Sequence, residues 1–598
     1  MKPAYFTKGF KAFLMTQMLG AFNDNFFKML LSLYFISILQ FPNAEELLFQ
    51  ASLAFTAPFL IFGPWSGYLA DRYAKTKVLQ ITKAAEIPIM ILGTLAVASA
   101  QPTFMNIVLF LMASQSAFFS PAKAGFIPET VGEAEISHAN GWVEMTTFFA
   151  IIAGQALTGI LLNLHHNRAI VITYYCIVIA IMGTLASRFI TPTAPSGAKG
   201  PFPWNPFSAI FKDLRYLKSY RGLFLAGLGN SYFWLLGLIF QVNIIVYGKS
   251  FLHLSETYNS LLAAFLAVGI GVGSMLAAKL SGKKVELGLV PLGGIGLTFF
   301  STLLFFTKTS YLASGMTLFL LGISGGFYII PLFAFLQFEA GFNEKGRVLA
   351  TVGVMNALFL VIGAFLYKLL AVQLGLAPDV LCLIMGILTL AVVIYICTLI
   401  PEYFIRFLAW LLTHSLYRIK IKGQENVPFH GPALLVVNHI SFIDALLVGA
   451  TIQRFIKFIM WKKIYDMPVI HFFCKIMHVI PIAPYEGREA VMASLAQGRA
   501  CLQAGELVCI FPEGGITRTG ELQPFKKGFE TIMEGIHAPI IPVCLKNVWG
   551  SIFSFEGGKV FFKWPKKFFY PVTVEYGQPL PPHTTAEAAE SVLRQMLA

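Results

Sequence analysis

Long apolar segments dominate the first 400 residues of this 598-residue chain. Twelve can be distinguished, near residues 10–40, 51–70, 79–99, 104–120, 143–164, 169–190, 222–247, 258–280, 287–307, 311–335, 348–373 and 378–400. A helix needs about 20 apolar residues to cross a bilayer, which tolerates few other backbone conformations. The segments therefore predict a polytopic α-helical membrane protein with twelve spans.

The loops between these segments are charged asymmetrically. With the N-terminus inside, inner segments hold nineteen Lys and Arg residues and outer segments hold four, namely Arg168, Lys249, Lys308 and Lys368. Because Lys and Arg concentrate in cytoplasmic loops, this asymmetry favours twelve spans with both ends cytoplasmic. The longest inner loop, about residues 191–221, follows the sixth segment, and six plus six spans are typical of two-lobed transporters.

Composition changes near residue 400. Charged residues number 39 in the first 400 residues and 35 in the last 198, which indicates a water-exposed domain after the bundle. We divide the chain into residues 1–400, an interfacial amphipathic linker helix at 401–418 and a second domain at 419–598. The net charge of +14 is explained by inner loops and contact with anionic lipid, so no nucleic acid partner is expected.

The second domain alternates apolar runs with helical stretches. Runs at 433–437, 507–511, 539–543 and 572–576 predict buried strands, with helices between them at 489–504 and 528–536. This alternation predicts an α/β layer domain. The spacing of Cys and His matches no metal site, and none is expected.

Polar residues follow the first two predicted strands. His439 and Asp444 come after the first, where the carboxylate can orient the imidazole as a general base. Glu513, Gly514 and Arg518 come after the second, and a guanidinium suits a phosphate group. A histidine beside a strand end is more often structural, so the spacing alone leaves that alternative open.

The segment Gly67-Tyr-Leu-Ala-Asp71-Arg72-Tyr-Ala-Lys75-Thr-Lys77 lies between the second and third predicted spans. It resembles the G-x-L-a-D-R-x-G-R-K loop of the major facilitator superfamily, with Ala74 in place of the usual glycine. The resemblance implies that Asp71 pairs with a neighbouring helix end and that Arg72 and the lysines gate the inner face. A solvated basic loop is the alternative.

Four more motifs occur in order along the membrane part: Ala21-Phe-Asn-Asp24-Asn25, Phe119-Ser-Pro-Ala-Lys123-Ala-Gly125, Ala139-Asn140-Gly141-x-x-Glu144 and Gly325-Gly326-Phe-x-x-x-Pro331-Leu-x-Ala-x-x-Gln337. Together they resemble the bacterial lysophospholipid transporter (LplT-type) branch of that superfamily. The resemblance implies that residues 1–400 flip lysophospholipid to the inner leaflet of a bacterial cytoplasmic membrane.

The first of these motifs places Asp24 well inside an apolar span. An intramembrane carboxylate is costly and usually faces a cavity or a partner, so Asp24, with Asn23 and Asn25, is predicted to bind or gate a zwitterionic head group. Lys28 is four residues later on the same face, which makes a local ion pair the alternative and leaves proton coupling open. Lys123 and Glu144 are further transport candidates, with interfacial side chains that reach water as the alternative.

The motif His439-x4-Asp444, followed by Phe511-Pro512-Glu513-Gly514 and Ile541-Pro542-Val543, resembles the glycerolipid acyltransferase family that includes 1-acylglycerol-3-phosphate acyltransferase (PlsC-like). The motif between them is matched only approximately by Tyr485-Glu486-Gly487-Arg488.

The resemblance implies that His439, oriented by Asp444, removes a proton from a glycerol hydroxyl, which then attacks an acyl thioester. Glu513 and Gly514 would hold the glycerol backbone, while Arg518, with Arg488, would hold the phosphate. It implies no bound cofactor, and acyl-coenzyme A or acyl-acyl carrier protein is the co-substrate.

Three basic pairs, Lys462-Lys463, Lys526-Lys527 and Lys566-Lys567, admit two interpretations: contact with anionic lipid, or docking of an acidic acyl carrier protein.

The whole sequence predicts a bifunctional salvage protein that flips lysophosphatidylethanolamine or lysophosphatidylglycerol inward and re-acylates it. Two alternatives remain open. The acyltransferase acts on lysophosphatidate in biosynthesis while the bundle transports another substrate, or the bundle is a scaffold without transport.

Overall fold

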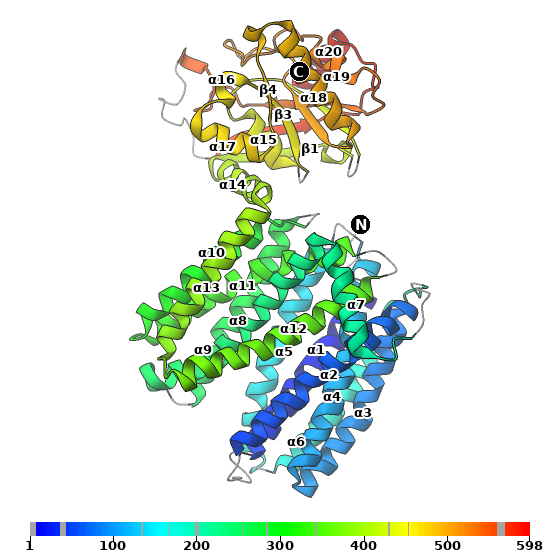
Figure 1. Ribbon diagram of the computed structural model, residues 1–598, viewed down its shortest axis with the longest axis vertical. Coiled ribbons are helices and arrows are strands. Elements are labelled where there is room, and N and C mark those ends of the chain that lie inside the picture. The colour runs from blue at the N-terminus through cyan, green and yellow to red at the C-terminus, as the bar shows by residue number, and fades with distance from the viewer. Residues whose placement is uncertain are drawn as a thin grey trace. The chain divides into compact units, whose positions relative to one another are not determined.

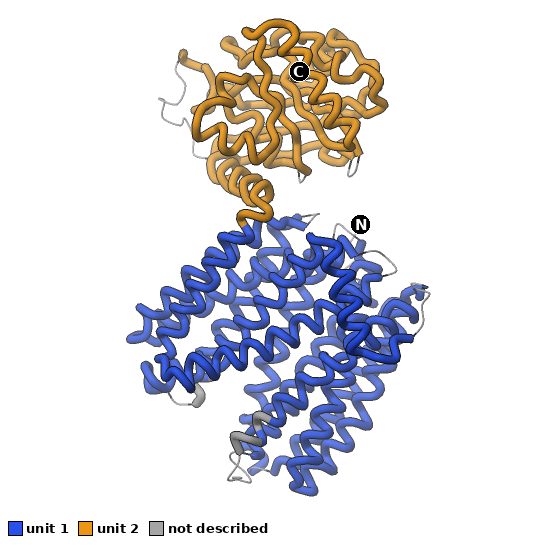
Figure 2. The backbone as a smooth tube through the Cα atoms, viewed as in Figure 1, with its two compact units in different colours: residues 1–396 blue, residues 397–598 orange. Residues whose placement is uncertain are grey.

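The computed structural model describes residues 7–35, 44–132, 135–166, 168–195, 197, 202–254, 256–282, 285–340, 344–428, 431–452, 454–558 and 569–598. The chain separates into two compact units, residues 1–396 and 397–598 (Figure 2). The predicted end of the first span at residue 40 and the Lys566-Lys567 pair lie outside the described residues.

The N-terminal unit is helical (Figure 1). Its long helices are α1 (Lys8–Leu33), α2 (Ala44–Arg72), α3 (Lys75–Ser99), α4 (Pro102–Thr130), α5 (Ile136–Leu164), α6 (Ala169–Ser187), α8 (Arg221–Leu252), α9 (Glu256–Ser281), α10 (Leu289–Thr307), α11 (Tyr311–Glu339), α12 (Lys345–Tyr367) and α13 (Pro378–Leu399).

Eleven helices in the described part of the chain are long and apolar enough to cross a membrane. The remaining long helix, α1, carries the charged residues Asp24 and Lys28 and is not among the eleven. The prediction of a polytopic helical protein is thus confirmed, while the count of twelve spans stays a prediction. The predicted inner loop at 191–221 also contains a helix, α7 (Pro206–Ser219).

Glycines bring α9 and α11 into close contact. A Cβ atom added at Gly269 would lie 2.1 Å from the carbonyl oxygen of Phe319, and one at Gly322 would lie 2.2 Å from that of Leu266. Only residues without a side chain allow the two backbones to approach this closely. Substitution of either glycine by alanine would therefore force these helices apart.

The C-terminal unit is built on a seven-stranded sheet of order β1-β7-β6-β2-β5-β3-β4. The strands are β1 (Tyr417–Lys422), β2 (Ala433–Val437), β3 (Ile456–Trp461), β4 (Ile480–Ile482), β5 (Leu507–Ile510), β6 (Ile540–Lys546) and β7 (Tyr570–Tyr576). All neighbours are parallel except β6 and β7, so β2, β5, β3 and β4 end at the same edge. The predicted α/β layer class is confirmed.

Helices cover both faces of this sheet. Side chains of β2 alternate between two cores: Leu435 packs with Leu447 of α15 (Asp444–Thr451), and Leu434 packs in the core that contains Leu495 of α18 (Arg488–Gln503) and Phe529 of α19 (Gly528–Met533). Burial on both faces is typical of parallel strands and explains their uninterrupted apolar runs. The remaining helices are α14 (Pro401–Leu416), α16 (Lys462–Tyr465), α17 (Pro468–Ile476) and α20 (Ala586–Leu597).

Candidate functional sites

His439 and Asp444 lie where β2 leads into α15. The Asp444 carboxylate is fully buried, and its Oδ2 accepts from Nδ1 of His439 at 2.9 Å and from the backbone N–H groups of Ile440 and Ser441 at 2.6 and 2.8 Å. Its Oδ1 accepts from the Ser441 hydroxyl at 2.5 Å. An ionised carboxylate only accepts, so Nδ1 carries the proton and Nε2 is left with a lone pair. This arrangement is suited to general-base chemistry at Nε2.

The backbone holds this pair in place. Asp444 is the first residue of α15, where the partial positive charge of the helix N-terminus favours a carboxylate. The neighbouring Asn438 is buried and exchanges two hydrogen bonds with Leu545 of β6, at 3.1 and 2.7 Å. The turn that carries His439 is therefore fixed to the sheet on one side and to α15 on the other.

Phe511, which the sequence interpretation did not place in the site, covers one face of the His439 ring. The two ring centroids are 4.2 Å apart and the rings are inclined by 25°. The same loop also holds the histidine backbone, because Thr517 N–H donates to the His439 carbonyl oxygen at 2.9 Å. Phe511 directly follows β5, the strand next to β2, and a large aromatic residue at that position was the sequence feature that could have revealed this contact.

Glu513 is buried in the loop that follows β5. Its side chain is 4% exposed, Oε1 accepts from His439 N–H at 2.7 Å, and Oε2 accepts from Gln523 N–H at 2.9 Å. Burial raises the pKa of this carboxyl, and the two backbone hydrogen bonds oppose that rise. Glu513 thus ties the loop after β2 to the loop after β5, and its role toward the glycerol backbone stays a prediction.

The three other predicted ligand residues lie at the same edge of the sheet. Gly514 has a φ of +74°, so a residue with a side chain would be strained there, and it is exposed next to Lys526. Arg518 is exposed, with its guanidinium 5.1 Å from the ring centroid of Phe555. Arg488 is the exposed first residue of α18, shortly after β4. Their roles toward glycerol and phosphate stay predictions.

Asp24 lines a cavity of about 170 Å³ inside the N-terminal unit. The cavity residues come from α1 to α4 and carry charges of both signs; they are Gln17, Gly20, Ala21, Asp24, Phe59, Lys83, Gln115, Ser116, Phe119, Ser120 and Lys123. Asp24 Oδ2 accepts from the Ser116 hydroxyl at 2.6 Å. Asp24 and Lys123 thus line one cavity, and the charge of Glu144 in α5 acts on Lys123.

The alternative of an ion pair between Asp24 and Lys28 is wrong. The Lys28 ammonium lies 4.7 Å from the ring centroid of Phe55, while Asp24 is bound to Ser116. Asn25 donates to the carbonyl oxygen of Ala21 at 2.8 Å, within its own helix. Asn25 is thus bonded within α1, and its role in transport stays a prediction.

A buried ion pair between Lys83 and Glu86 was missed. Lys83 is one of the nineteen cations that the charge asymmetry assigns to inner segments, yet it lies within α3 and is 1% exposed. Asn23 donates to Glu86 Oε1 at 2.6 Å, which explains why this amide is buried on α1. The spacing of Lys83 and Glu86, three residues apart on one helix face, was the sequence feature that predicts such a pair.

Asp71 accepts hydrogen bonds from the first turn of α12. Its two oxygens lie 2.6 Å from Gly346 N and 2.7 Å from Arg347 N, so the carboxylate meets the positive end of this helix. The neighbouring Arg72 is exposed and lies over the Tyr68 ring, 5.6 Å from its centroid. Its gating role stays a prediction.

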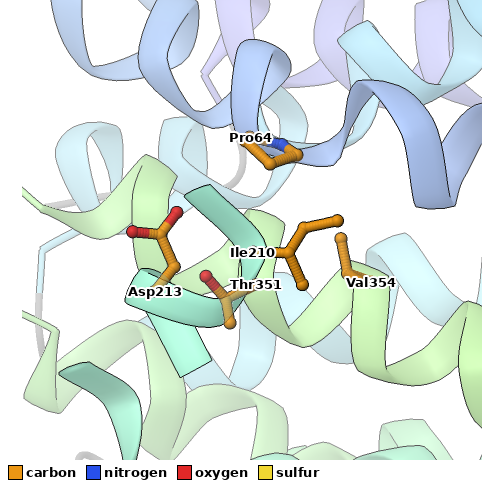
Figure 3. A pocket seen from close by; sticks show the side chains of 5 residues that line it. All are labelled: Pro64, Ile210, Asp213, Thr351 and Val354. Atoms are coloured by element: carbon orange, nitrogen blue, oxygen red, sulfur yellow. The ribbon is translucent and has the colours of Figure 1, made fainter. Parts of the chain in front are cut away.

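Helix α7 joins this contact from the central loop. Asp213 of α7 forms an ion pair with Arg347 at 2.6 Å. Figure 3 shows Asp213 and Ile210 facing Pro64 of α2 and Thr351 and Val354 of α12, around a cavity of about 10 Å³. That volume is about the size of one water molecule, so it is packing space and not a substrate site.

Comparison with known proteins explains why the chain combines a bundle of membrane helices with an α/β domain. Residues 13–364 match the model of the Major Facilitator Superfamily, and residues 418–546 match the Acyltransferase family model. The chain belongs to the major facilitator superfamily and carries an acyltransferase domain after its membrane helices.

Individual proteins resemble the N-terminal unit. The chain is 29% identical over 358 residues to the lysophospholipid transporter LplT of Enterobacter sp. strain 638, covering 59% of this chain and 84% of the relative. It is 28% identical over 384 residues to LplT of Klebsiella pneumoniae, covering 63% and 92%. The solved transporter FucP, in an outward conformation, covers 66% of this chain and 98% of its own with a TM-score of 0.54 at 14% identity, which shows a shared fold.

Proposed function

We propose that this protein moves lysophospholipid across a bacterial cytoplasmic membrane and re-acylates it to diacyl phospholipid. The observation that carries the proposal is the presence, in one chain, of a charged intramembrane cavity and an acyltransferase His-Asp pair. Its LplT relatives are lysophospholipid transporters, which supports the choice of substrate. Both termini and the acyltransferase unit lie on the cytoplasmic side in this proposal.

The acyl transfer proceeds without a covalent enzyme intermediate. His439 Nε2 accepts the proton of a glycerol hydroxyl while its oxygen attacks the carbonyl carbon of the acyl thioester. The carbon–sulfur bond then breaks, the ester forms, and the imidazolium returns the proton to the departing thiolate of coenzyme A or acyl carrier protein. Asp444 stabilises the imidazolium, the Phe511 ring packs against the imidazole, and Glu513 holds the backbone of His439.

The cavity suits a zwitterionic head group. Asp24 and Lys123 line it together, so a carboxylate can meet the ammonium of ethanolamine while a lysine meets the phosphate. Lys83 also lines the cavity but is paired with Glu86, which leaves Lys123 as the primary partner of the phosphate. Removal of lysolipid by acylation would draw transport toward the acyltransferase side without ion coupling.

Two measurements on purified full-length protein test the proposal. Acyl transfer is followed in detergent with lysophosphatidylethanolamine, lysophosphatidylglycerol and lysophosphatidate as acceptors, each with acyl-coenzyme A and acyl-acyl carrier protein. We expect one of the first two acceptors to have the highest kcat/KM. A preference for lysophosphatidate would instead support a biosynthetic acyltransferase.

The second measurement follows labelled lysophosphatidylethanolamine across proteoliposomes that contain the His439→Ala variant. We expect transport at the wild-type initial rate with no diacyl product. Vesicles that move no lysolipid would favour a membrane scaffold.

A further inference from the structure

Helix α20 follows the last strand of the sheet and is firmly attached to the C-terminal unit. Its side chains Ala589 and Leu593 are fully buried in the core that α18 and α19 share with β6 (Figure 1). The first turn is fixed as well, because Ala586 N–H donates to Glu530 of α19 at 2.6 Å. Side chains on the neighbouring faces of α20 are therefore held at defined positions over the domain.

Two polar side chains of α20 contact a loop that contains no helix or strand. Glu590 Oε2 accepts from Phe525 N–H at 3.0 Å, and Arg594 Nη2 donates to the carbonyl oxygen of Leu522 at 3.2 Å. Glu590 and Arg594 lie one helical turn apart and also form an ion pair at 2.8 Å. We refer to residues 522–526 as the bridging loop. Helix α20 thus holds the backbone of this loop at two points.

The bridging loop also contacts the loop after β5, which carries Glu513. Gln523 N–H donates to Glu513 Oε2 at 2.9 Å, and Lys526 N–H donates to the carbonyl oxygen of Pro512 at 2.9 Å. Through its other oxygen, Glu513 accepts from His439 N–H at 2.7 Å. The contacts to α20 and to the loop of Glu513 alternate along the bridging loop. A continuous series of contacts therefore leads from α20 to the backbone of His439.

Charge strengthens the contacts at both ends of this series. A hydrogen bond to an ionised acceptor is stronger than one between neutral groups. The hydrogen bond from Phe525 N–H lowers the pKa of the Glu590 carboxyl, which is therefore ionised at neutral pH. Burial raises the pKa of the Glu513 carboxyl, and the N–H groups of Gln523 and His439 oppose this rise. The position of Gln523 thus favours the ionised form of Glu513.

We propose that Glu590 is a positioning residue for acyl transfer and acts through the bridging loop on Glu513 and His439. It touches no substrate. It keeps Gln523 where its N–H meets Glu513, and Glu513 holds the backbone that carries the imidazole. The inference rests on the proposed acyl transfer by His439, and it adds a helix beyond the last strand of the sheet to the residues on which that reaction depends.

A double-mutant cycle on full-length protein in detergent tests this assignment, with kcat measured at saturating lysophosphatidylethanolamine and acyl-coenzyme A. We expect Glu590→Ala to lower kcat about fivefold, equivalent to about 1 kcal/mol, with little change in KM for the thioester. In a Glu513→Gln background the same substitution should lower kcat by less than about twofold, because residues that act through one another are not additive. Equal losses in both backgrounds, or no loss in either, would overturn the proposal.

Two further variants separate positioning from a general effect on the helix. Glu587→Ala removes an exposed glutamate from the first turn of α20, where a negative charge stabilises the helix, and we expect it to keep wild-type kcat. Glu590→Gln keeps an oxygen that can accept from Phe525 N–H, so kcat should stay within about twofold of wild type. Equal losses in Glu587→Ala and Glu590→Ala, or a Glu590→Gln variant as slow as Glu590→Ala, would mean that α20 serves only the fold.

Arg594→Gln tests the second contact of α20 independently of any folding defect in Glu590→Ala. It removes the donor to the Leu522 carbonyl oxygen, and kcat should fall about twofold in the wild-type chain and not at all in the Glu513→Gln background. Equal losses in the two backgrounds would again overturn the proposal. A wild-type chain that transfers no acyl group would contradict the proposed function itself, whereas an active chain that is insensitive to these substitutions would contradict only this inference.

Discussion

Replacing Asp444 with asparagine separates the charge of this carboxylate from its hydrogen bonds. Three N–H groups point at Oδ2: Nδ1 of His439 at 2.9 Å and the backbone of Ile440 and Ser441 at 2.6 and 2.8 Å. An amide nitrogen in that position would face three donors. The asparagine should therefore place its oxygen there and its NH2 group against the Ser441 hydroxyl, which can accept. His439 keeps its proton on Nδ1, and only the charge is lost.

The expected size of this effect follows from the bond that changes. A hydrogen bond to a charged group is worth about 1.5 to 3 kcal/mol and a neutral one about 0.5 to 1.5 kcal/mol. The difference, about 1 to 2 kcal/mol, is the stabilisation that the imidazolium loses when it forms during the reaction. This loss corresponds to a roughly 5- to 30-fold lower kcat. Removing the base altogether, as in His439→Ala, should cost about 100- to 10,000-fold.

The assay is steady-state acyl transfer in detergent with saturating thioester, for wild type, Asp444→Asn, His439→Ala and Ser441→Ala. The last variant is the matched control, because it removes the hydrogen bond to Oδ1 and keeps the charge. We expect it to retain more activity than Asp444→Asn. The reasoning would be refuted if Asp444→Asn were as inactive as His439→Ala, or as active as wild type.

Three further predictions concern other contacts. Phe511→Leu removes the ring stacked on His439, worth about 0.5 to 1.5 kcal/mol, so kcat should fall about 2- to 13-fold with little change in KM for the lysolipid. Asp71→Asn weakens the contact with the α12 N-terminus by about 0.3 to 2 kcal/mol; lysolipid transport in vesicles should slow while acyl transfer in detergent stays unchanged. Lys83→Met leaves Glu86 buried without its partner, which costs about 3 to 5 kcal/mol, and thermal unfolding should show that adding Glu86→Gln restores most of the loss.

Much of the fold was predictable because strong periodic or compositional features encode it. The apolar segments of the N-terminal unit are long and few residues interrupt them, and the buried strands of the C-terminal unit carry unbroken apolar runs at 433–437 and 507–510. Helix α7 was missed because its sequence is polar overall and its amphipathic pattern lies in a segment rich in Pro and Gly. Strand β4 has three residues, too few for periodicity to show.

The site was predictable only where contacts are local in sequence. His439 and Asp444 are five residues apart, so the spacing indicated their contact. Glu513 binds the His439 backbone from 74 residues away, and Phe511 stacks on the same residue from the next strand, so neither geometry can be derived without the strand order. Asp24 was noticed as a buried charge, but its partner Ser116 lies on another helix and has no charge to attract attention.

The central claim is that one chain contains two separable activities acting in sequence. The most direct measurement offers labelled lysophosphatidylethanolamine to proteoliposomes on the side opposite the acyltransferase unit, with acyl thioester on the other side, and quantifies lysolipid moved and diacyl lipid made. We predict that wild type does both and that His439→Ala moves lysolipid without product. Asp24→Ala should neither move lysolipid nor make product, although it acylates lysolipid in detergent. Loss of both activities in both variants would contradict the account.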